Sequence, residues 1–154
     1  MINMKYLARI ILAFFFFGVW VFEQPASAGD YRLVKITDEL DMPWGLAFLP
    51  NGDLLVTELS GSLRRVSDGK VSDPIRNVPD VLYEGQGGLM DVVLHPDFAA
   101  NNLVYLTYAA GTSDANHLVL MRARLENDAL VNPETLYKTQ NRNRPVHYGG
   151  RLVF

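Results

Sequence analysis

The sequence is poor in the residues that crosslink chains or bind nucleic acids. It contains no cysteine among its 154 residues, so disulfides and a lipid-modified cysteine are both excluded. It also has no excess of positive charge, because 14 basic and 17 acidic residues give a formal net charge of −3. Phosphate binding requires a clustered positive field, so we expect no nucleic-acid partner. The short basic pairs Arg64-Arg65 and Arg142/Arg144 are interpreted as solvated charges.

The sequence also lacks an apolar run long enough to cross a membrane. The uncharged apolar run from Ile10 to Phe22 has 13 residues, whereas a membrane-spanning helix needs about 20. Lys5 and Arg9 precede this run and Ala26-Ser27-Ala28 follows it, in the order typical of a secretory signal peptide. We therefore predict a signal peptide over residues 1–28, a mature chain without a membrane span, and a periplasmic or secreted location. An uncleaved N-terminal anchor is the alternative.

Helical periodicity is almost absent from residues 29–154. This part consists of short apolar runs, rich in Val, Leu, Thr and Tyr, that alternate with turn signals. Asn51-Gly52 and Asp68-Gly69 are tight-turn dipeptides, because both central residues of a type I′ turn need a positive φ. The pattern predicts an all-β domain built from antiparallel hairpins.

Two stretches of the sequence resemble each other. Leu46 to Glu58, "LAFLPNGDLLVTE", and Val92 to Tyr108, "VVLHPDFAANNLVYLTY", each contain a strand, a proline-led turn and a second strand with threonine near its end. The turn prolines, Pro50 and Pro96, are 96 − 50 = 46 residues apart. Periods of roughly 40–50 residues are typical of β-propeller blades, which have four short strands each. A β-sandwich with two similar hairpins is the alternative.

The last residues, "GGRLVF" from Gly149 to Phe154, are expected to open a third unit. Propellers close with about 4–8 blades, so two blades and one strand cannot complete a ring. We therefore expect residues 29–154 to be the truncated N-terminal part of a longer propeller.

A glycine-rich segment lies between the two similar stretches. In "YEGQGGLMDVVLHPDF", Gly85, Gly87 and Gly88 surround Gln86. A dinucleotide-binding loop must follow a strand and open a helix, whereas the pattern here continues into another strand, so nucleotide binding is excluded. We expect the glycines to turn the backbone sharply and to leave Gln86 projecting beside a strand.

The three histidines differ in their surroundings. His95 lies in a proline turn, where ring packing and capping by Asp97 predict a structural role, and His117 begins an alternating strand. His147 lies between a polar loop and a glycine pair, and an imidazole, with an unperturbed pKa of about 6.5, can act as a general base. Histidines and carboxylates show no zinc-ligand spacing, and no serine lies in a nucleophile-elbow pattern.

Three segments in combination indicate a family. "MPWGLAFLPNGDLLVTE", "EGQGGLMDVVLHPDF" and "HYGGRLVF" resemble the N-terminal part of the soluble aldose sugar dehydrogenases that depend on pyrroloquinoline quinone (PQQ), within the glucose/sorbosone dehydrogenase family. The resemblance covers residues 31–154 and implies a six-bladed propeller in the full-length protein, with PQQ and calcium as cofactors. Most ligands of both cofactors are then expected beyond residue 154, and we assign no metal ligand within the chain.

The resemblance also implies roles for two residues. His147 corresponds to the histidine that takes the proton from the anomeric hydroxyl of the sugar, and Gln86 to the glutamine that faces the quinone and the sugar. Val146 replaces the polar residue that some members carry before this histidine, which leaves the sugar preference open. The expected partners are an aldose and a downstream electron acceptor.

The resulting prediction is the N-terminal part of an exported quinone-dependent dehydrogenase that converts aldoses to lactones and is inactive without its later blades. Two other classes remain as alternatives, namely a non-catalytic propeller that binds sugars or proteins and a lactonase-type hydrolase. Reduction of an artificial electron acceptor distinguishes them from a dehydrogenase, because neither alternative transfers electrons.

Overall fold

The computed structural model describes residue 29 and residues 31–154. The predicted signal peptide, residues 1–28, lies outside the described residues. Residues 35–154 form one compact unit, and the described residues of the preceding unit have no regular secondary structure. No helix in the described part of the chain combines the length and apolar character needed to cross a membrane.

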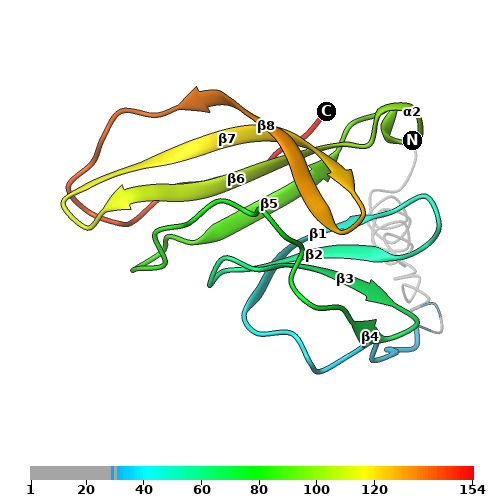
Figure 1. The fold of residues 1–154 in the computed structure, drawn as a ribbon. Coiled ribbons are helices and arrows are strands. Elements are labelled where there is room, and N and C mark those ends of the chain that lie inside the picture. Colours follow the sequence, from blue (N-terminus) through cyan, green and yellow to red (C-terminus); the bar gives the residue numbers. More distant parts are fainter. Residues whose placement is uncertain (1–28, 30) are drawn as a thin grey trace, which may run out of the picture. The chain divides into compact units, whose positions relative to one another are not determined.

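Two four-stranded antiparallel sheets make up residues 35–154 (Figure 1). In chain order, the first contains β1 (Pro43–Phe48), β2 (Leu54–Glu58), β3 (Leu63–Ser67) and β4 (Lys70–Val71). The second contains β5 (Leu89–Leu94), β6 (Leu103–Thr112), β7 (Ala115–Glu126) and β8 (Ala129–Lys138), with the one-turn helix α2 (Phe98–Asn101) between β5 and β6. Each sheet is a meander in which neighbours in sequence are neighbours in space. The all-β prediction and the two blades are therefore confirmed.

One hydrophobic core is shared by the two sheets. Leu55 and Leu63 of the first sheet and Val92, Leu106 and Met121 of the second belong to the same buried cluster. In β7, burial alternates along the strand, as expected for a sheet with one face in the core. The apolar runs that predicted the strands thus supply the side chains that pack between the sheets.

The turns agree with the sequence at one position and differ at another. Asp68 and Gly69 have φ values of 49° and 79° and form the predicted type I′ turn between β3 and β4. The same prediction is wrong for Asn51-Gly52, where only Gly52 has a positive φ, because the Asn51 side chain bonds the N–H and carboxylate of Asp53 in a longer loop. Asn127-Asp128, with φ values of 49° and 53°, joins β7 and β8 by a turn that was not predicted from the sequence.

Both sheets break register at the same place. The pairing of β1 with β2 shifts between Pro43 and Leu46, and that of β5 with β6 shifts between Leu89 and Val92. These positions are 46 residues apart, since 89 − 43 = 46 and 92 − 46 = 46. The sequence period therefore corresponds to a structural repeat.

At each register break, a threonine in the second strand of the sheet accepts a hydrogen bond from a backbone N–H of the first strand. Thr57 Oγ1 accepts the N–H of Gly45 at 2.8 Å, and Thr107 Oγ1 accepts the N–H of Asp91 at 3.1 Å. Both hydroxyls donate onward, from Thr57 to the carbonyl of Met90 and from Thr107, at 2.6 Å, to the carbonyl of Gly150. We call these two hydroxyl bridges the threonine links.

The segment Gly149–Phe154 does not form the predicted strand. A strand is defined by its pairing with a neighbour, and the polar groups here bind side chains instead. The Leu152 N–H and the Arg151 guanidinium donate to the carboxylate of Asp91, at 2.8 and 2.9 Å. Gly150 nevertheless occupies, relative to Thr107, the position that Met90 of β5 occupies relative to Thr57.

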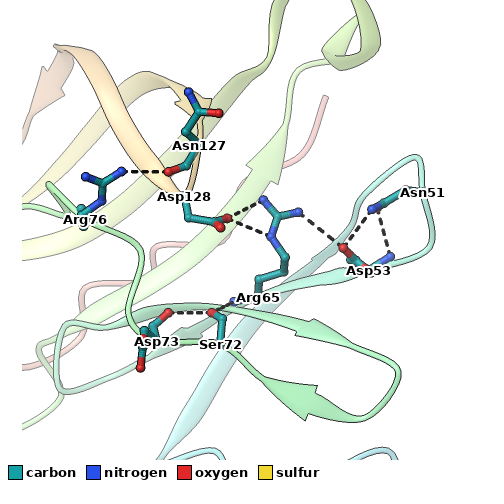
Figure 2. Close-up of polar contacts among 8 residues, drawn as sticks. All are labelled: Asn51, Asp53, Arg65, Ser72, Asp73, Arg76, Asn127 and Asp128. Atoms are coloured by element: carbon teal, nitrogen blue, oxygen red, sulfur yellow. Dashed lines mark hydrogen bonds and ion pairs between the residues drawn. The ribbon is translucent and has the colours of Figure 1, made fainter.

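Charged side chains connect the two sheets on one side (Figure 2). Arg65 of β3 donates to Asp128 of the β7–β8 turn at 2.8 and 3.0 Å, and lies 3.5 Å from the carboxylate of Asp53. Arg64 donates to buried Glu58 at 2.9 Å. The interpretation of Arg64-Arg65 as merely solvated charges is therefore wrong, because both are paired within the chain.

Candidate functional site

Two loops that are distant in sequence meet beside β5. The glycine-rich loop, residues 84–88, precedes β5, and the loop at residues 141–149 follows β8. The N–H of Gln86 donates to the carbonyl of Pro145 at 2.8 Å, and the N–H of His147 donates to Gln86 Oε1 at 2.7 Å. Gly85 makes this approach possible, because it has a φ of 60° and a Cβ at this position would lie 2.5 Å from the Pro145 carbonyl oxygen. The structure thus brings together the two site residues predicted from the sequence.

His147 has an unusual backbone conformation. Its φ of 56° is left-handed, which costs on the order of 1–3 kcal/mol in a residue other than glycine. Its N–H binds Gln86, and its carbonyl accepts a hydrogen bond from Arg142 Nη1 at 2.8 Å. The side chain is exposed, and within residues 29 and 31–154 its imidazole receives and donates no hydrogen bond. Both ring nitrogens can therefore interact with a ligand.

The residue after His147 is anchored in the interior. Tyr148 is buried, and its hydroxyl donates to Oδ1 of fully buried Asn116 at 2.6 Å. Burial raises the pKa of Tyr148, so the phenol stays protonated and remains a donor at neutral pH. Asn116 also exchanges two main-chain hydrogen bonds with Arg142, at 2.7 and 3.0 Å. Asn116, Arg142 and Tyr148 had not been identified from the sequence, because their contacts depend on how the loop at residues 141–149 returns to β7.

A cavity of about 470 Å³ lies beside these residues. Its walls come from both sheets and both loops, and they consist of Trp44, Leu59, Gly85, Gln86, Met90, His147, Tyr148 and Gly149. Trp44 and Met90 are equivalent in the repeat, since 90 − 44 = 46, so each sheet contributes the same position of its first strand. Predominantly apolar walls with a few convergent polar groups are typical of ligand sites.

A second hollow, of about 550 Å³, also borders His147. Polar and charged residues predominate among those that line it, which are Asp114, Asn141, Arg142, Asn143, Arg144, Val146 and His147. His147 is the one residue that borders both spaces within the part of the chain that the structure describes. His147 therefore borders both the mainly apolar cavity and a hollow lined mostly by charged and amide residues.

The other histidines lie outside the cavity lined by Gln86 and His147. His95 stacks on Tyr105, with ring centroids 6.2 Å apart, and its Nδ1 accepts the N–H of Asp97 at 3.0 Å. His95 therefore has the packing and turn contacts predicted for it, but the capping prediction for Asp97 is wrong, because the Asp97 side chain makes no capping hydrogen bond. His117 lies near the start of β7, as predicted, with Nδ1 3.0 Å from Asn141 Oδ1.

A metal site is not formed by the described residues. Across residues 29 and 31–154, no three His, Asp or Glu side chains gather in a metal-binding group. The calcium ion implied by the sequence resemblance therefore has no assigned ligands among these residues.

Comparisons with known proteins agree with this architecture. Residues 40–154 match the family described as Glucose / Sorbosone dehydrogenase. The chain is 42% identical over 137 residues to the aldose sugar dehydrogenase YliI of Escherichia coli strain K12, a match that covers 84% of this chain and 36% of that protein.

Solved structures give the same result. Soluble aldose sugar dehydrogenase from Escherichia coli, in its apo form, matches with a TM-score of 0.73 and 41% identity, over 77% of this chain and 36% of that one. The PQQ-bound aldose sugar dehydrogenase of Streptomyces coelicolor matches with a TM-score of 0.64 and 31% identity, over 79% of this chain and 37% of that one.

The two sheets thus correspond to blades of a β-propeller dehydrogenase. The chain belongs to the glucose/sorbosone dehydrogenase family. It spans about a third of the length of these relatives, and 36% of the curated Escherichia coli protein.

Proposed function

We propose that this chain supplies the catalytic base of an aldose dehydrogenase that oxidises the anomeric C1 hydroxyl of sugars to lactones and depends on PQQ. The observation that carries the proposal is the contact between His147 and Gln86 on the wall of one cavity, where the His147 N–H donates to Gln86 Oε1 at 2.7 Å. Membership of the family and the named activity of the Escherichia coli relative support it.

The reaction requires two transfers from the sugar. The C1–H bond breaks and its electron pair leaves as a hydride, while the hydroxyl proton leaves and the C1–O bond becomes the carbonyl of the lactone. His147 accepts the proton at a ring nitrogen, which lowers the barrier because hydride loss is favoured as negative charge develops on the oxygen. When bound, PQQ supplies the two-electron acceptor.

The residues of the cavity suit one face of a planar cofactor. Trp44 and Tyr148 provide aromatic walls, and Gln86 provides an amide whose Nε2 has no hydrogen-bond partner among the residues described. The lining includes no lysine or arginine, although the carboxylates of PQQ need cationic partners. We therefore propose that those partners come from later blades, and that the 154-residue chain alone is inactive.

A chimera tests the proposal. Residues 29–154 are joined to the later blades of the Escherichia coli relative and loaded with PQQ and calcium. We expect aldose-dependent reduction of an artificial dye by the chimera and none by the chain alone. A folded chimera that binds PQQ without reducing the dye contradicts the proposal. Hydrolysis of lactones without electron transfer would instead indicate the hydrolase class.

We also propose that the protein is exported. The proposal rests on the basic, apolar and Ala-Ser-Ala segments of residues 1–28, in that order. N-terminal sequencing of the protein from its native host should give Gly29 as the first residue, in the periplasmic or extracellular fraction. A chain that begins at Met1 in the membrane fraction contradicts export with cleavage.

A further inference from the structure

The backbone of His147 is held from both sides by side chains. Its N–H binds Gln86 Oε1 at 2.7 Å and its carbonyl accepts Arg142 Nη1 at 2.8 Å. Residues 145–150 belong to no strand, so no ladder of main-chain hydrogen bonds fixes this segment. These two bonds therefore replace the constraint that a sheet would provide.

Arg142 is itself fixed by the protein interior. Its main chain pairs with that of Asn116, which is fully buried in β7, and its guanidinium lies 5.9 Å from the ring centroid of Tyr148. Tyr148 in turn donates to the side chain of Asn116 at 2.6 Å. Asn116 thus binds Arg142 through its main chain and Tyr148 through its side chain. These two residues in turn restrain His147, Arg142 by a hydrogen bond and Tyr148 as its neighbour in the chain.

We propose that Gln86, Arg142 and Asn116 form a clamp of positioning residues that keeps His147 in its left-handed conformation. Without the clamp, a non-glycine residue at this position relaxes toward negative φ, and such a rotation redirects the whole side chain. Since a general base must lie within about 2.6–3.2 Å of the proton that it takes, this rotation removes the imidazole from its working position. The expected loss of proton transfer rests on the proposed function, whereas the expected change in the backbone conformation of His147 does not.

Gln86 has two separable roles in this arrangement. Its Oε1 accepts the N–H of His147, which leaves Nε2 as the group available to a ligand. Gln86→Glu keeps an acceptor for His147 and removes the Nε2 donor, and Gln86→Leu removes both. The two variants therefore separate positioning of the histidine from contact with the ligand.

Amide hydrogen exchange in the 154-residue chain tests the clamp without any cofactor or activity. In Arg142→Met, exchange of the His147 amide should accelerate by about tenfold or more, because local opening sets its rate, while amides of β5 to β8 keep theirs. Arg124→Met is the matched control, since Arg124 is exposed on β7 and makes no side-chain hydrogen bond with the described residues. An unchanged His147 amide in Arg142→Met overturns the proposal.

A second pair of variants protects the test against misfolding. Gln86→Glu should retain the protection of the His147 amide and Gln86→Leu should lose it, and equal protection in both overturns the role of Gln86. Tyr148→Phe should loosen the segment from the side of Asn116, and it replaces Arg142→Met if that variant does not fold. An unchanged His147 amide in Tyr148→Phe then also counts against the clamp.

In the chimera, Arg142→Met should lower kcat by about tenfold or more and leave KM within about twofold, because a displaced base slows proton transfer without removing a sugar contact. If the parent chimera shows no dye reduction, the proposed function fails and the exchange measurements still decide the clamp. If the parent is active and kcat is unchanged in a variant whose His147 amide is deprotected, the positioning role is refuted.

Discussion

The two sheets have the same strand arrangement but are preceded by different segments. Both break register at equivalent positions and both satisfy the break with a threonine. They differ in what precedes them, since a segment without regular structure leads into β1, whereas the glycine-rich loop leads into β5 and contacts His147 through Gln86. The two sheets therefore share their repeated strands, whereas Gln86 and His147 lie in loops outside those strands.

A second difference concerns the first strands. The repeat places Gly45 in β1 where β5 has Asp91, since 91 − 45 = 46. The two positions are in contact, because a Cβ on Gly45 would lie 2.8 Å from Asp91 Oδ1. Each sheet also buries one carboxylate that binds an arginine and a backbone N–H, Glu58 in the first sheet and Asp91 in the second. Glu58 and Asp91 thus make the same kinds of contact, although they do not occupy equivalent positions in the repeat.

The largest expected effect is on kcat and comes from His147, in the loop that follows the second sheet. In the chimera, His147→Asn should lower kcat by about 10²–10⁴-fold, because asparagine tolerates a positive φ but cannot accept the proton. His117→Asn is the control, since His117 lies on β7 outside the cavity. Steady-state dye reduction measures both, and the assignment of the base fails if His117→Asn alone abolishes activity.

The threonine links test what the sheets share. Thr57→Val should lower the free energy of unfolding by about 1–3 kcal/mol, because the buried N–H of Gly45 loses its acceptor. Thr107→Val should cost less than Thr57→Val, since its second partner, Gly150, belongs to no strand. Urea unfolding compares both with Thr112→Val at the exposed end of β6. Equal losses in all three variants would show that the links contribute nothing specific.

A methyl group added at Gly45, where β1 differs from β5, should lower the free energy of unfolding by a similar or smaller amount. Gly45→Ala should destabilise the chain by about 1–3 kcal/mol, because the new Cβ meets Asp91 Oδ1 and, at 2.9 Å, the Met90 carbonyl. The matched control is Ala99→Gly in α2, where the exposed side chain leaves only a change in backbone freedom. Unchanged stability in Gly45→Ala would mean that the sheets separate there at little cost.

The smallest effect is expected for the ion pair between the sheets. Arg65→Met should cost at most about 1 kcal/mol at low salt, since Asp128 is mostly exposed and the pair is screened. The loss should shrink as salt is added to about 0.5 M, in unfolding curves compared with those of Arg124→Met. A loss that is large and independent of salt would indicate that Arg65 acts through packing of its aliphatic stem.

Much of the frame was predictable, because strand alternation and the 46-residue spacing are local or repeated signals. Asp68-Gly69 was recognised as a turn because glycine marks it, whereas Asn127-Asp128 forms the same kind of turn without glycine. The failure at Gly149–Phe154 has another cause, since a strand depends on a neighbour and not on its own residues alone.

The site was predictable only in part. Gln86 and His147 were identified from the resemblance of their segments, and the structure brings them into contact. Asn116 gave no signal and Arg142 was interpreted only as a solvated charge, because their contact is a main-chain pairing across 142 − 116 = 26 residues. The positive φ of His147 was equally hidden, since histidine adopts that conformation more often than most residues but still only rarely.

The threonine links also have a direction. Each hydroxyl receives a bond from its own sheet and gives its single proton to a residue later in the chain, from Thr57 to Met90 and from Thr107 to Gly150. The ribosome releases the chain in the same order, and domains emerge N-terminus first. During synthesis, the donor of each link is therefore made before its acceptor, and the Thr57 link joins the finished first sheet to the first strand of the second.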